Sequence, residues 1–176
     1  SDIVLARLPA NSALDYVTIH RYPNPSGKAL EGVGRVLNNL RSAFPGKPVL
    51  LGEFGFSNES MSPDESANYE MGMFMLLISE GFGGGAKWML NDFPKGANPR
   101  QNAFGAYLTD GSSKPVVAAT KGLADYLSRS PATGGHIYML DKQPPGYRWA
   151  FESNDALVIS AARYQGNRLS FEAERL

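Results

Sequence analysis

Segments with the pattern of a strand alternate with segments that have helical periodicity along the first 130 or so residues. The expected strands are 14–23, 48–54 and 85–93, and the expected helices are 26–44, 62–82 and 114–129. The unit repeats at a regular interval, because 33 positions separate His20 from Glu53 and 35 separate Glu53 from Trp88. This alternation predicts an α/β fold with parallel strands and with helices packed outside them.

The sequence also predicts where the second helix begins and what kind of structure follows Ser130. Ser62 is a good N-cap, Pro63 suits the first helical position, and Glu65 completes a capping box. After Ser130 the chain changes to short β-like runs separated by Pro-Pro-Gly, Asn-Asp and Gly-Asn turns. We therefore expect a small antiparallel β module, with a β-sandwich-like character, attached to the α/β part.

Composition argues against several classes of partner. Lys plus Arg and Asp plus Glu both number 17, and no cluster of basic residues stands out, so we expect neither nucleic acid nor an anionic membrane surface as a partner. The chain has no cysteine, which excludes disulfides and thiolate metal sites. No stretch of about 18 consecutive apolar residues is present, so we expect no membrane span.

Polar and aromatic side chains gather where the expected strands end. Glu53 follows the apolar run that starts at Pro48, and Trp88 lies on the next expected strand. His20 and Tyr22 are two positions apart, so they share one face of the first strand. The polar pair Asn91 and Asp92 closes the third expected strand. In parallel α/β folds the carboxyl ends of strands meet at one edge, where function gathers.

A carboxylate, an imidazole, a phenol and an indole together suit glycoside hydrolysis. A retaining enzyme needs an ionised carboxylate as nucleophile, hydrogen-bond donors that keep it ionised, and an aromatic face for the sugar ring. Each residue also has a purely structural interpretation. Glu53 suits a strand-end salt bridge, His20 a structural hydrogen bond and Trp88 the core, while Asn91 and Asp92 suit ordinary turns or helix caps.

Four short motifs resemble the clan A glycoside hydrolases, the (β/α)8 barrels typified by family 5 cellulases and mannanases. "IHRYP" resembles the His-x-Tyr strand, "PVLLGEFG" the seventh strand with its Glu-x-Gly ending, and "GAKWML" the eighth strand. "FGAYLTDGSSKPVVAATK" resembles the segment that enters the last barrel helix. Each motif is weak alone, but their order and spacing agree over Leu14 to Arg129.

The resemblance implies a role for each matching residue. Glu53 would be the nucleophile, His20 and Tyr22 would hold and orient it, and Trp88 would be the sugar platform. The loop residues implied to line the substrate site are Phe56, Asn91 and Asp92. The implied substrate is an oligo- or polysaccharide, and neither a metal nor an organic cofactor is implied. The implied organisation is strands six to eight of the barrel in 1–129 and a β-rich module in 130–176.

The sequence departs from this family in one large respect. In the family, the acid/base glutamate follows an asparagine at the end of the fourth strand. The only Asn-Glu pair in this sequence is Asn58-Glu59, which lies in the wrong place, just after the nucleophile strand. A complete barrel takes about 250 residues, whereas the α/β part here has about 130. Three strands alone would leave two open edges.

We therefore expect this chain to be inactive alone. We expect it to be a C-terminal piece whose first residues, "SDIVLARLP", end the fifth barrel helix. The alternatives are a missing half supplied by another chain, or a half-barrel that associates with itself. Polysaccharide enzymes are usually exported, so a secreted or cell-surface location is favoured.

Two other functional classes remain open at this stage. One is a non-catalytic carbohydrate-binding or scaffolding half-barrel, in which Trp88, Phe56 and Tyr22 would supply stacking surfaces. The other is an unrelated doubly wound α/β protein. It has little support, because no Gly-x-Gly-x-x-Gly follows a strand, and the Gly-x-Ser-x-Gly of a serine hydrolase is absent as well.

Overall fold

The structure is a computed structural model of the 176-residue chain. It describes residues 13–26, 28–96, 101–128, 136–141, 146–153, 156–165 and 168–175. The expected end of a barrel helix at residues 1–9 lies outside the described residues.

Three parallel strands form the first sheet, in the order β1-β2-β3. They are β1 (Val17–Arg21), β2 (Val49–Phe54) and β3 (Gly84–Lys87). The predicted alternation of parallel strands and helices is confirmed, because a helix follows each of these strands in the chain.

Helices α2 (Ala29–Ala43), α3 (Pro63–Ser79) and α4 (Pro115–Ser128) follow the three strands. The predicted start of α3 is confirmed. The Ser62 side chain accepts a hydrogen bond from the backbone N–H of Glu65, and the Glu65 carboxylate accepts one from the backbone N–H of Ser62. This capping box satisfies backbone donors that the first helical turn leaves without partners.

The tail forms a second sheet, which is antiparallel and has the order β4-β5-β6-β7. Its strands are β4 (His136–Asp141), β5 (Gly146–Ser153), β6 (Ala156–Gln165) and β7 (Arg168–Arg175). The expected antiparallel β module is therefore confirmed as a sheet.

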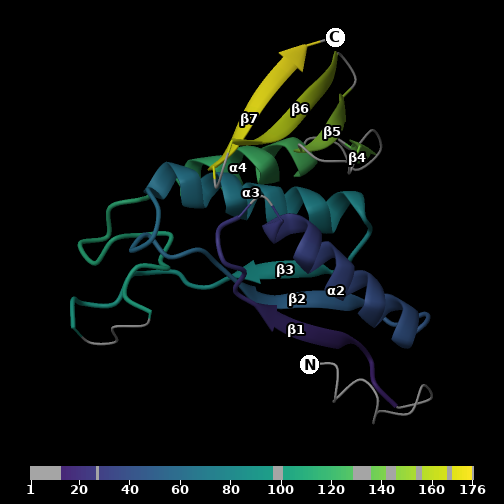
Figure 1. Cartoon of the computed structure of the whole chain (residues 1–176), viewed down its shortest axis with the longest axis horizontal. Helices are drawn as coiled ribbons and strands as arrows, with labels where there is room; N and C mark the ends of the chain where they lie inside the picture. The colour runs from purple at the N-terminus through teal and green to yellow at the C-terminus, as the bar shows by residue number, and fades with distance from the viewer. Residues whose placement is uncertain are drawn as a thin grey trace.

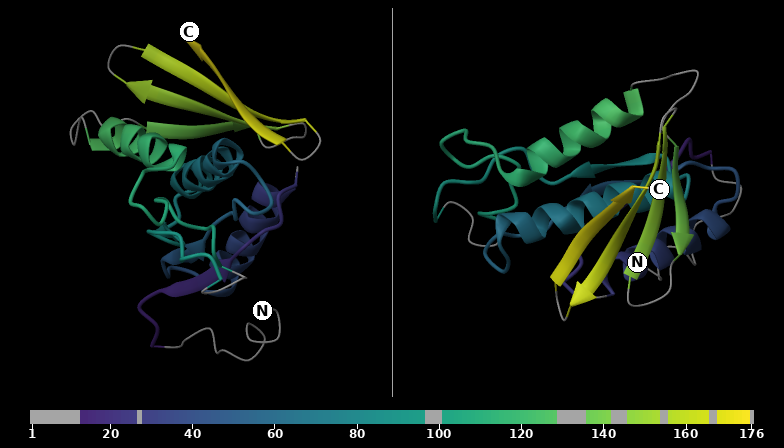
Figure 2. Two further views of the ribbon diagram at one scale, coloured as in Figure 1. Left: turned by 90° about the vertical axis from the view of Figure 1, so that its left-hand side faces the viewer. Right: turned by 90° about the horizontal axis from the view of Figure 1, so that it is seen from above.

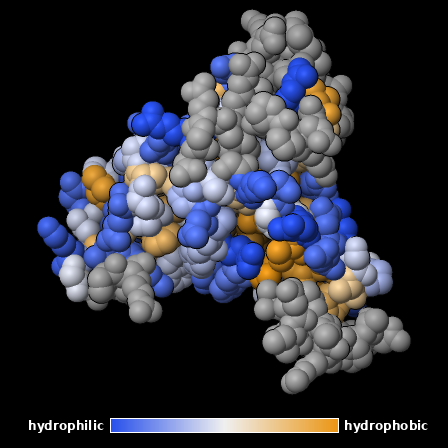
Figure 3. Space-filling model, viewed as in Figure 1, coloured by the Kyte–Doolittle hydropathy of each residue, from blue (hydrophilic) through white to orange (hydrophobic). Residues whose placement is uncertain are grey.

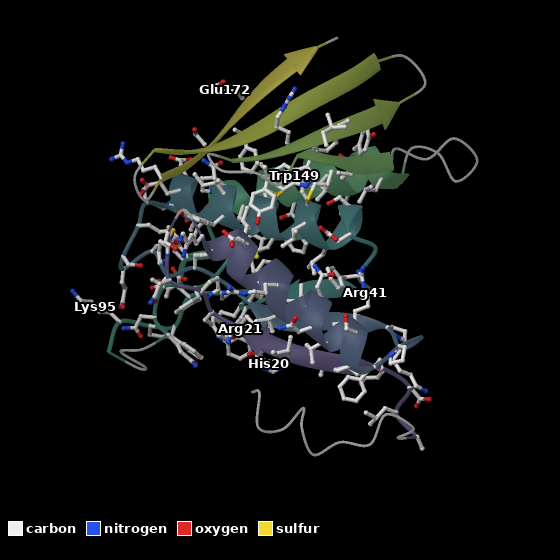
Figure 4. All side chains as sticks on the ribbon, turned by 45° about the vertical axis from the view of Figure 1, so that its right-hand side comes forward. His20, Arg21, Arg41, Lys95, Trp149 and Glu172 are labelled. Carbon is white, nitrogen blue, oxygen red and sulfur yellow. The ribbon has the colours of Figure 1, made fainter. Side chains whose placement is uncertain are left out.

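The molecule has three layers, with α3 and α4 between the two sheets (Figures 1 and 2). α3 contacts β3 on one side and both β4 and β7 on the other. Trp149 lies between the antiparallel sheet and the helices (Figure 4) and is fully buried. One hydrophobic cluster joins all three layers and includes Leu51 of β2, Met73 of α3 and Trp149 of β5.

The third strand is shorter than the sequence pattern predicts. We expected a strand over 85–93, but β3 ends at Lys87. The backbone N–H of Trp88 still donates to the Phe54 carbonyl at 2.7 Å, and Met89 then donates to Phe104 instead. The chain leaves the sheet here because a loop, rather than β2, supplies the next hydrogen-bond partners.

The two faces of the parallel sheet differ. α2 covers one face and turns hydrophilic side chains outward (Figures 1 and 3). On the opposite face, Thr18 and His20 are exposed. None of the helices that the structure describes is long and apolar enough to cross a membrane.

Candidate active site

The register between β1 and β2 brings His20 beside Glu53. Pairing runs from Val17 with Val49 to Ile19 with Leu51, and then shifts so that His20 pairs with Glu53. The shift leaves Gly52 as an extra residue on β2. Bulges of this kind are common next to active sites, because one extra residue redirects the side chains that follow it.

Gly52 is required by this close approach. A Cβ atom at position 52 would overlap Thr18 Oγ1 and would lie 3.1 Å from the His20 ring. The irregular position therefore needs the residue that has no side chain, and the sequence supplies it in "LLGEF".

Two side chains of the β1 segment converge on one oxygen of Glu53. The Tyr22 hydroxyl donates to Glu53 Oε2 at 2.6 Å, and His20 Nδ1 lies 3.1 Å from the same oxygen. The Glu53 side chain is 29% exposed. Partial burial, the hydrogen bond to Glu53 and the nearby negative charge together raise the pKa of Tyr22 above its ordinary value, so the phenol stays a donor.

Trp88 lies directly after β3, the strand that pairs with β2. It is partly buried, and its peptide bond to Met89 is cis. Its backbone is held near the Glu53 strand, because Trp88 N donates to Phe54 O. A side chain at Gly55 would overlap the Trp88 carbonyl, so the two segments pack closely here. Trp88 therefore stands at the same end of the sheet as Glu53.

The structure places Phe56 in the core. Its side chain is 2% exposed, and its ring stacks on Tyr69 with 4.8 Å between the ring centroids. The resemblance implies that Phe56 lines the substrate loops, but a buried and stacked ring has no free face for a sugar. We therefore do not retain it as a substrate contact.

The structure ties Asp92 to a buried lysine. Asp92 Oδ1 accepts from Lys114 Nζ at 2.8 Å and from the Gly105 backbone at 2.7 Å, and only 11% of the Asp92 side chain is exposed. Lys114 also donates to Asn58 at 2.7 Å. These contacts favour a role in holding loops together. Asn91 is exposed and pairs with Tyr107 through an isolated bridge, so its side chain remains available.

Three residues that the sequence analysis did not single out lie beside this site. The Phe104 ring packs edge-on against Tyr22, with 5.6 Å between centroids and 88° between planes. Lys87 Nζ donates to the Phe104 carbonyl at 2.6 Å and lies 2.7 Å from Glu70 Oε1. The sequence did contain a signal for Lys87, because a charged residue immediately before Trp88, within an otherwise apolar strand pattern, is unusual. In the part of the chain described, no group of three or more acidic or histidine side chains could hold a metal ion.

Comparisons with known proteins show similarity in structure but not in sequence. No protein-family model matches the chain, and no curated protein matches it in sequence. A family 39 glycoside hydrolase from Bacteroides cellulosilyticus WH2 is 18% identical with a TM-score of 0.62, over 86% of this chain and 34% of that one. A GH5_18 protein from Bifidobacterium longum, solved with Manb1-4GlcNAc, is 19% identical with a TM-score of 0.57, over 67% of this chain and 32% of that one.

A third neighbour belongs to another group of glycosidases. β-Glucuronidase 2 from Bacteroides uniformis, covalently bound to cyclophellitol-6-carboxylate aziridine, is 17% identical with a TM-score of 0.51, over 92% of this chain and 26% of that one. The chain thus spans about a third or less of these neighbours. Because they come from different families, they do not assign the chain to family 5. They show that the fold of this chain is similar to a part of each of these glycoside hydrolases.

Proposed function

We propose that this chain is part of a retaining glycoside hydrolase that acts on β-linked glycans, with Glu53 as the nucleophile. The observation that carries the proposal is the convergence of Tyr22 and His20 on one oxygen of a carboxylate at a parallel strand end. That arrangement fixes a carboxylate in one orientation, as a nucleophile requires.

The proposed reaction has two steps. The contacts from Tyr22 and His20 both fall on Oε2 among the described residues, so Oε1 is the oxygen for attack. Oε1 bonds to the anomeric carbon while the glycosidic C–O bond breaks, and an acid/base carboxyl protonates the leaving oxygen. The same acid/base then removes a proton from water, which attacks the anomeric carbon and releases Glu53. Trp88 stacks on the apolar face of the sugar.

The acid/base residue would come from a part of the barrel that this chain does not contain. The chain spans 32% and 34% of its GH5_18 and family 39 neighbours, so about two thirds of each neighbour has no counterpart in it. One carboxylate cannot act as nucleophile and acid/base in the same retaining cycle. We propose that the chain alone is inactive and that it functions together with the rest of the barrel.

The substrate class rests on the neighbours and on the chemistry of the site. The GH5_18 neighbour was solved with a β-linked disaccharide, and an aromatic platform beside a carboxylate suits a pyranose ring. We extend to this chain only the class, a β-linked oligo- or polysaccharide.

The test is hydrolysis of aryl β-glycosides of mannose, glucose and glucuronic acid by the polypeptide that unites this chain with the rest of its barrel. We expect Glu53→Gln to lower kcat by about a thousandfold or more, because it removes the nucleophile. The control is Glu59→Gln, a nearby exposed carboxylate, which should leave turnover unchanged. Turnover that survives Glu53→Gln would overturn the proposal. Oligosaccharide binding without turnover in the unmodified protein would instead indicate the non-catalytic alternative.

A further inference from the structure

A buried ion pair joins α3 to the end of β3, next to the candidate site. Glu70 comes from α3 and its side chain is 1% exposed, while Lys87 is the last residue of β3 and its side chain is 12% exposed. Their charged atoms are 2.7 Å apart. The proposed mechanism uses neither residue, so the pair needs another explanation.

Stability alone explains this pair poorly. Burial raises the pKa of the Glu70 carboxyl and lowers the pKa of the Lys87 ammonium, and their mutual attraction opposes both shifts. Glu70 Oε2 is buried and has no hydrogen-bond partner among the described residues. Replacing a buried ion pair with apolar side chains is often neutral or stabilising, so stability alone does not account for this pair.

The remaining contacts of the pair go to backbone atoms that border the site. Lys87 Nζ donates to the Phe104 carbonyl at 2.6 Å, and Glu70 Oε1 accepts a long hydrogen bond of 3.4 Å from the Phe56 backbone. The ion pair thereby joins α3, the end of β3, the segment after β2 and the loop that carries Phe104.

Phe104 links this pair to the Glu53 contacts. Its ring lies edge-on to Tyr22, and the Tyr22 hydroxyl donates to Glu53. It also lies against the Gly55 backbone, where a Cβ atom would be 3.1 Å from the ring. Phe104 therefore has little freedom to move without displacing Tyr22. Tyr22 is itself 42% exposed.

We propose that Lys87, held by Glu70, is a positioning residue for the nucleophile, because it fixes Phe104, which orients the Tyr22 hydroxyl onto Glu53. The predicted effect on catalysis rests on the proposed function, but the predicted effect on geometry does not. The geometric claim, that the ion pair controls the contact between Tyr22 and Glu53, can be tested in the chain itself without activity.

The geometric test uses nuclear magnetic resonance of the chain labelled with ¹³C at the tyrosine ring, with the Tyr22 signal assigned by Tyr22→Phe. Glu53→Gln should shift the Tyr22 Cζ signal, because it removes the charge that accepts the hydroxyl hydrogen bond. In the charge-free double variant Glu70→Leu/Lys87→Met, the same Glu53→Gln change should shift the signal far less. The matched control is Lys121→Met/Asp125→Leu, which removes an exposed pair on α4 and should preserve the full shift.

The kinetic test is a double-mutant cycle in the polypeptide with the complete barrel. Tyr22→Phe should lower kcat by about tenfold to a hundredfold, because it removes a hydrogen bond to a charged group. Glu70→Leu/Lys87→Met should lower kcat by about tenfold with KM nearly unchanged. When the ion-pair double variant is added to Tyr22→Phe, kcat should fall little further, because both changes act through the same contact between Tyr22 and Glu53. A merely structural role predicts losses that multiply.

Every outcome decides the proposal. An undiminished Tyr22 shift in the charge-free variant, or multiplied kinetic losses, would overturn it. If the charge-free variant does not fold, Glu70→Gln/Lys87→Met replaces it in both tests, because this change also removes the Lys87 hydrogen bond to the Phe104 carbonyl. Failure of the proposed function is distinguishable, because it appears as turnover that survives Glu53→Gln while the resonance result stands.

Discussion

Glu53 points toward Tyr22 and His20 because β2 is irregular at Gly52. In a regular strand Glu53 would share the face of Leu51, which is fully buried. The buried residues of β2 are Val49, Leu51 and Phe54, so the two-residue alternation holds up to Leu51 and slips by one residue before Phe54. The slip keeps both apolar side chains in the core and leaves the carboxylate at the open face.

A substitution at Gly52 tests this explanation. We expect Gly52→Ala to destabilise the chain by about 1–3 kcal/mol, because the new methyl group overlaps Thr18 Oγ1 and crowds the His20 ring. The matched control is Gly32→Ala in α2, where nothing lies within 4 Å of the added atom. That change should stabilise by about 0.5–1 kcal/mol. Urea unfolding measures both, and a Gly52→Ala chain as stable as the parent would contradict the bulge explanation.

The Tyr22 hydroxyl gives a prediction about pH. Its pKa is raised above the ordinary value of 10.0, first by burial and then by Glu53, so it remains protonated through neutral and mildly alkaline pH. We expect ultraviolet titration to show no ionisation of Tyr22 up to about pH 10, with its contribution taken as the difference between the parent chain and Tyr22→Phe. Ionisation of Tyr22 below that pH would rule out the hydrogen bond to the carboxylate.

At the residue scale, the sequence was informative about chemistry but not about burial. Parallel pairing predicted that the ends of β1 and β2 meet, but the partly exposed position of Glu53 depends on the irregularity at Gly52, which a two-residue period does not predict. The core position of Phe56 was not predictable either, because its stacking on Tyr69 depends on how α3 packs. The buried partners of Asp92 also come from segments distant in the sequence. Such tertiary contacts leave no local signal.

At the element scale, α3 begins where the capping signals predict. We expect Ser62→Ala to cost about 1 kcal/mol, because the Glu65 backbone N–H loses its side-chain acceptor. Ser42→Ala, at an exposed position inside α2, is the control and should be neutral or slightly stabilising. Thermal or urea unfolding measures the difference. Equal effects of the two changes would show that the cap contributes nothing.

The same cap contributes to acid sensitivity. The backbone N–H of Ser62, followed by its hydroxyl, lowers the pKa of Glu65 below the ordinary 4.5. A lowered folded-state pKa means that the contribution to stability is present above about pH 4.5 and is lost as the pH falls below that value. We expect Glu65→Gln to flatten the dependence of unfolding free energy on pH in that acidic window. An unchanged slope would indicate that Glu65 does not contribute.

The helices and strands were largely predictable, but the end of β3 was not. β3 ends before Trp88 because the Met89 N–H pairs with the Phe104 loop. Apolar residues continue through Leu90, so their pattern gave no sign of the change of partner. Leu90 is in fact 70% exposed.

At the scale of the whole molecule, one core joins the parallel sheet to the antiparallel sheet. Leu169 of β7 is 1% exposed and its backbone carbonyl accepts from Asn68 of α3 at 2.9 Å. A Cβ atom at Gly72 of α3 would lie 3.3 Å from the Leu169 side chain. The small residue thus lets the second sheet approach the helix layer closely.

This shared core predicts that both sheets unfold together. The chain has two tryptophans, Trp88 after β3 and Trp149 in β5, so replacing either one by Phe gives a fluorescence probe of one layer. We expect Leu169→Ala to lower stability by about 2–5 kcal/mol by both probes. Leu140→Ala, at a 51% exposed position in β4, is the control and should change it by less than about 0.5 kcal/mol.

Different responses of the two tryptophan probes would contradict the shared core. If the Trp88 transition does not respond to Leu169→Ala while the Trp149 transition does, the two sheets unfold separately. The boundary predicted from the sequence near residue 130 would then separate independent domains. Sequence patterns indicated the two sheet types correctly, but whether they share a core depends on packing between α3 and β7, which periodicity does not describe.

The most direct measurement of the central claim is covalent trapping of the nucleophile. A 2-deoxy-2-fluoro β-glycoside with a good leaving group traps the glycosyl-enzyme of a retaining glycosidase. The fluorine slows both the formation and the hydrolysis of this intermediate, whereas the good leaving group speeds only its formation. The intermediate therefore accumulates. We would treat the polypeptide containing the complete barrel with such glycosides, and then digest it and identify the modified residue by mass spectrometry. Our account predicts an adduct on Glu53 that is absent in Glu53→Gln. An adduct on another carboxylate, or hydrolysis of the parent glycosides without any adduct, would contradict it.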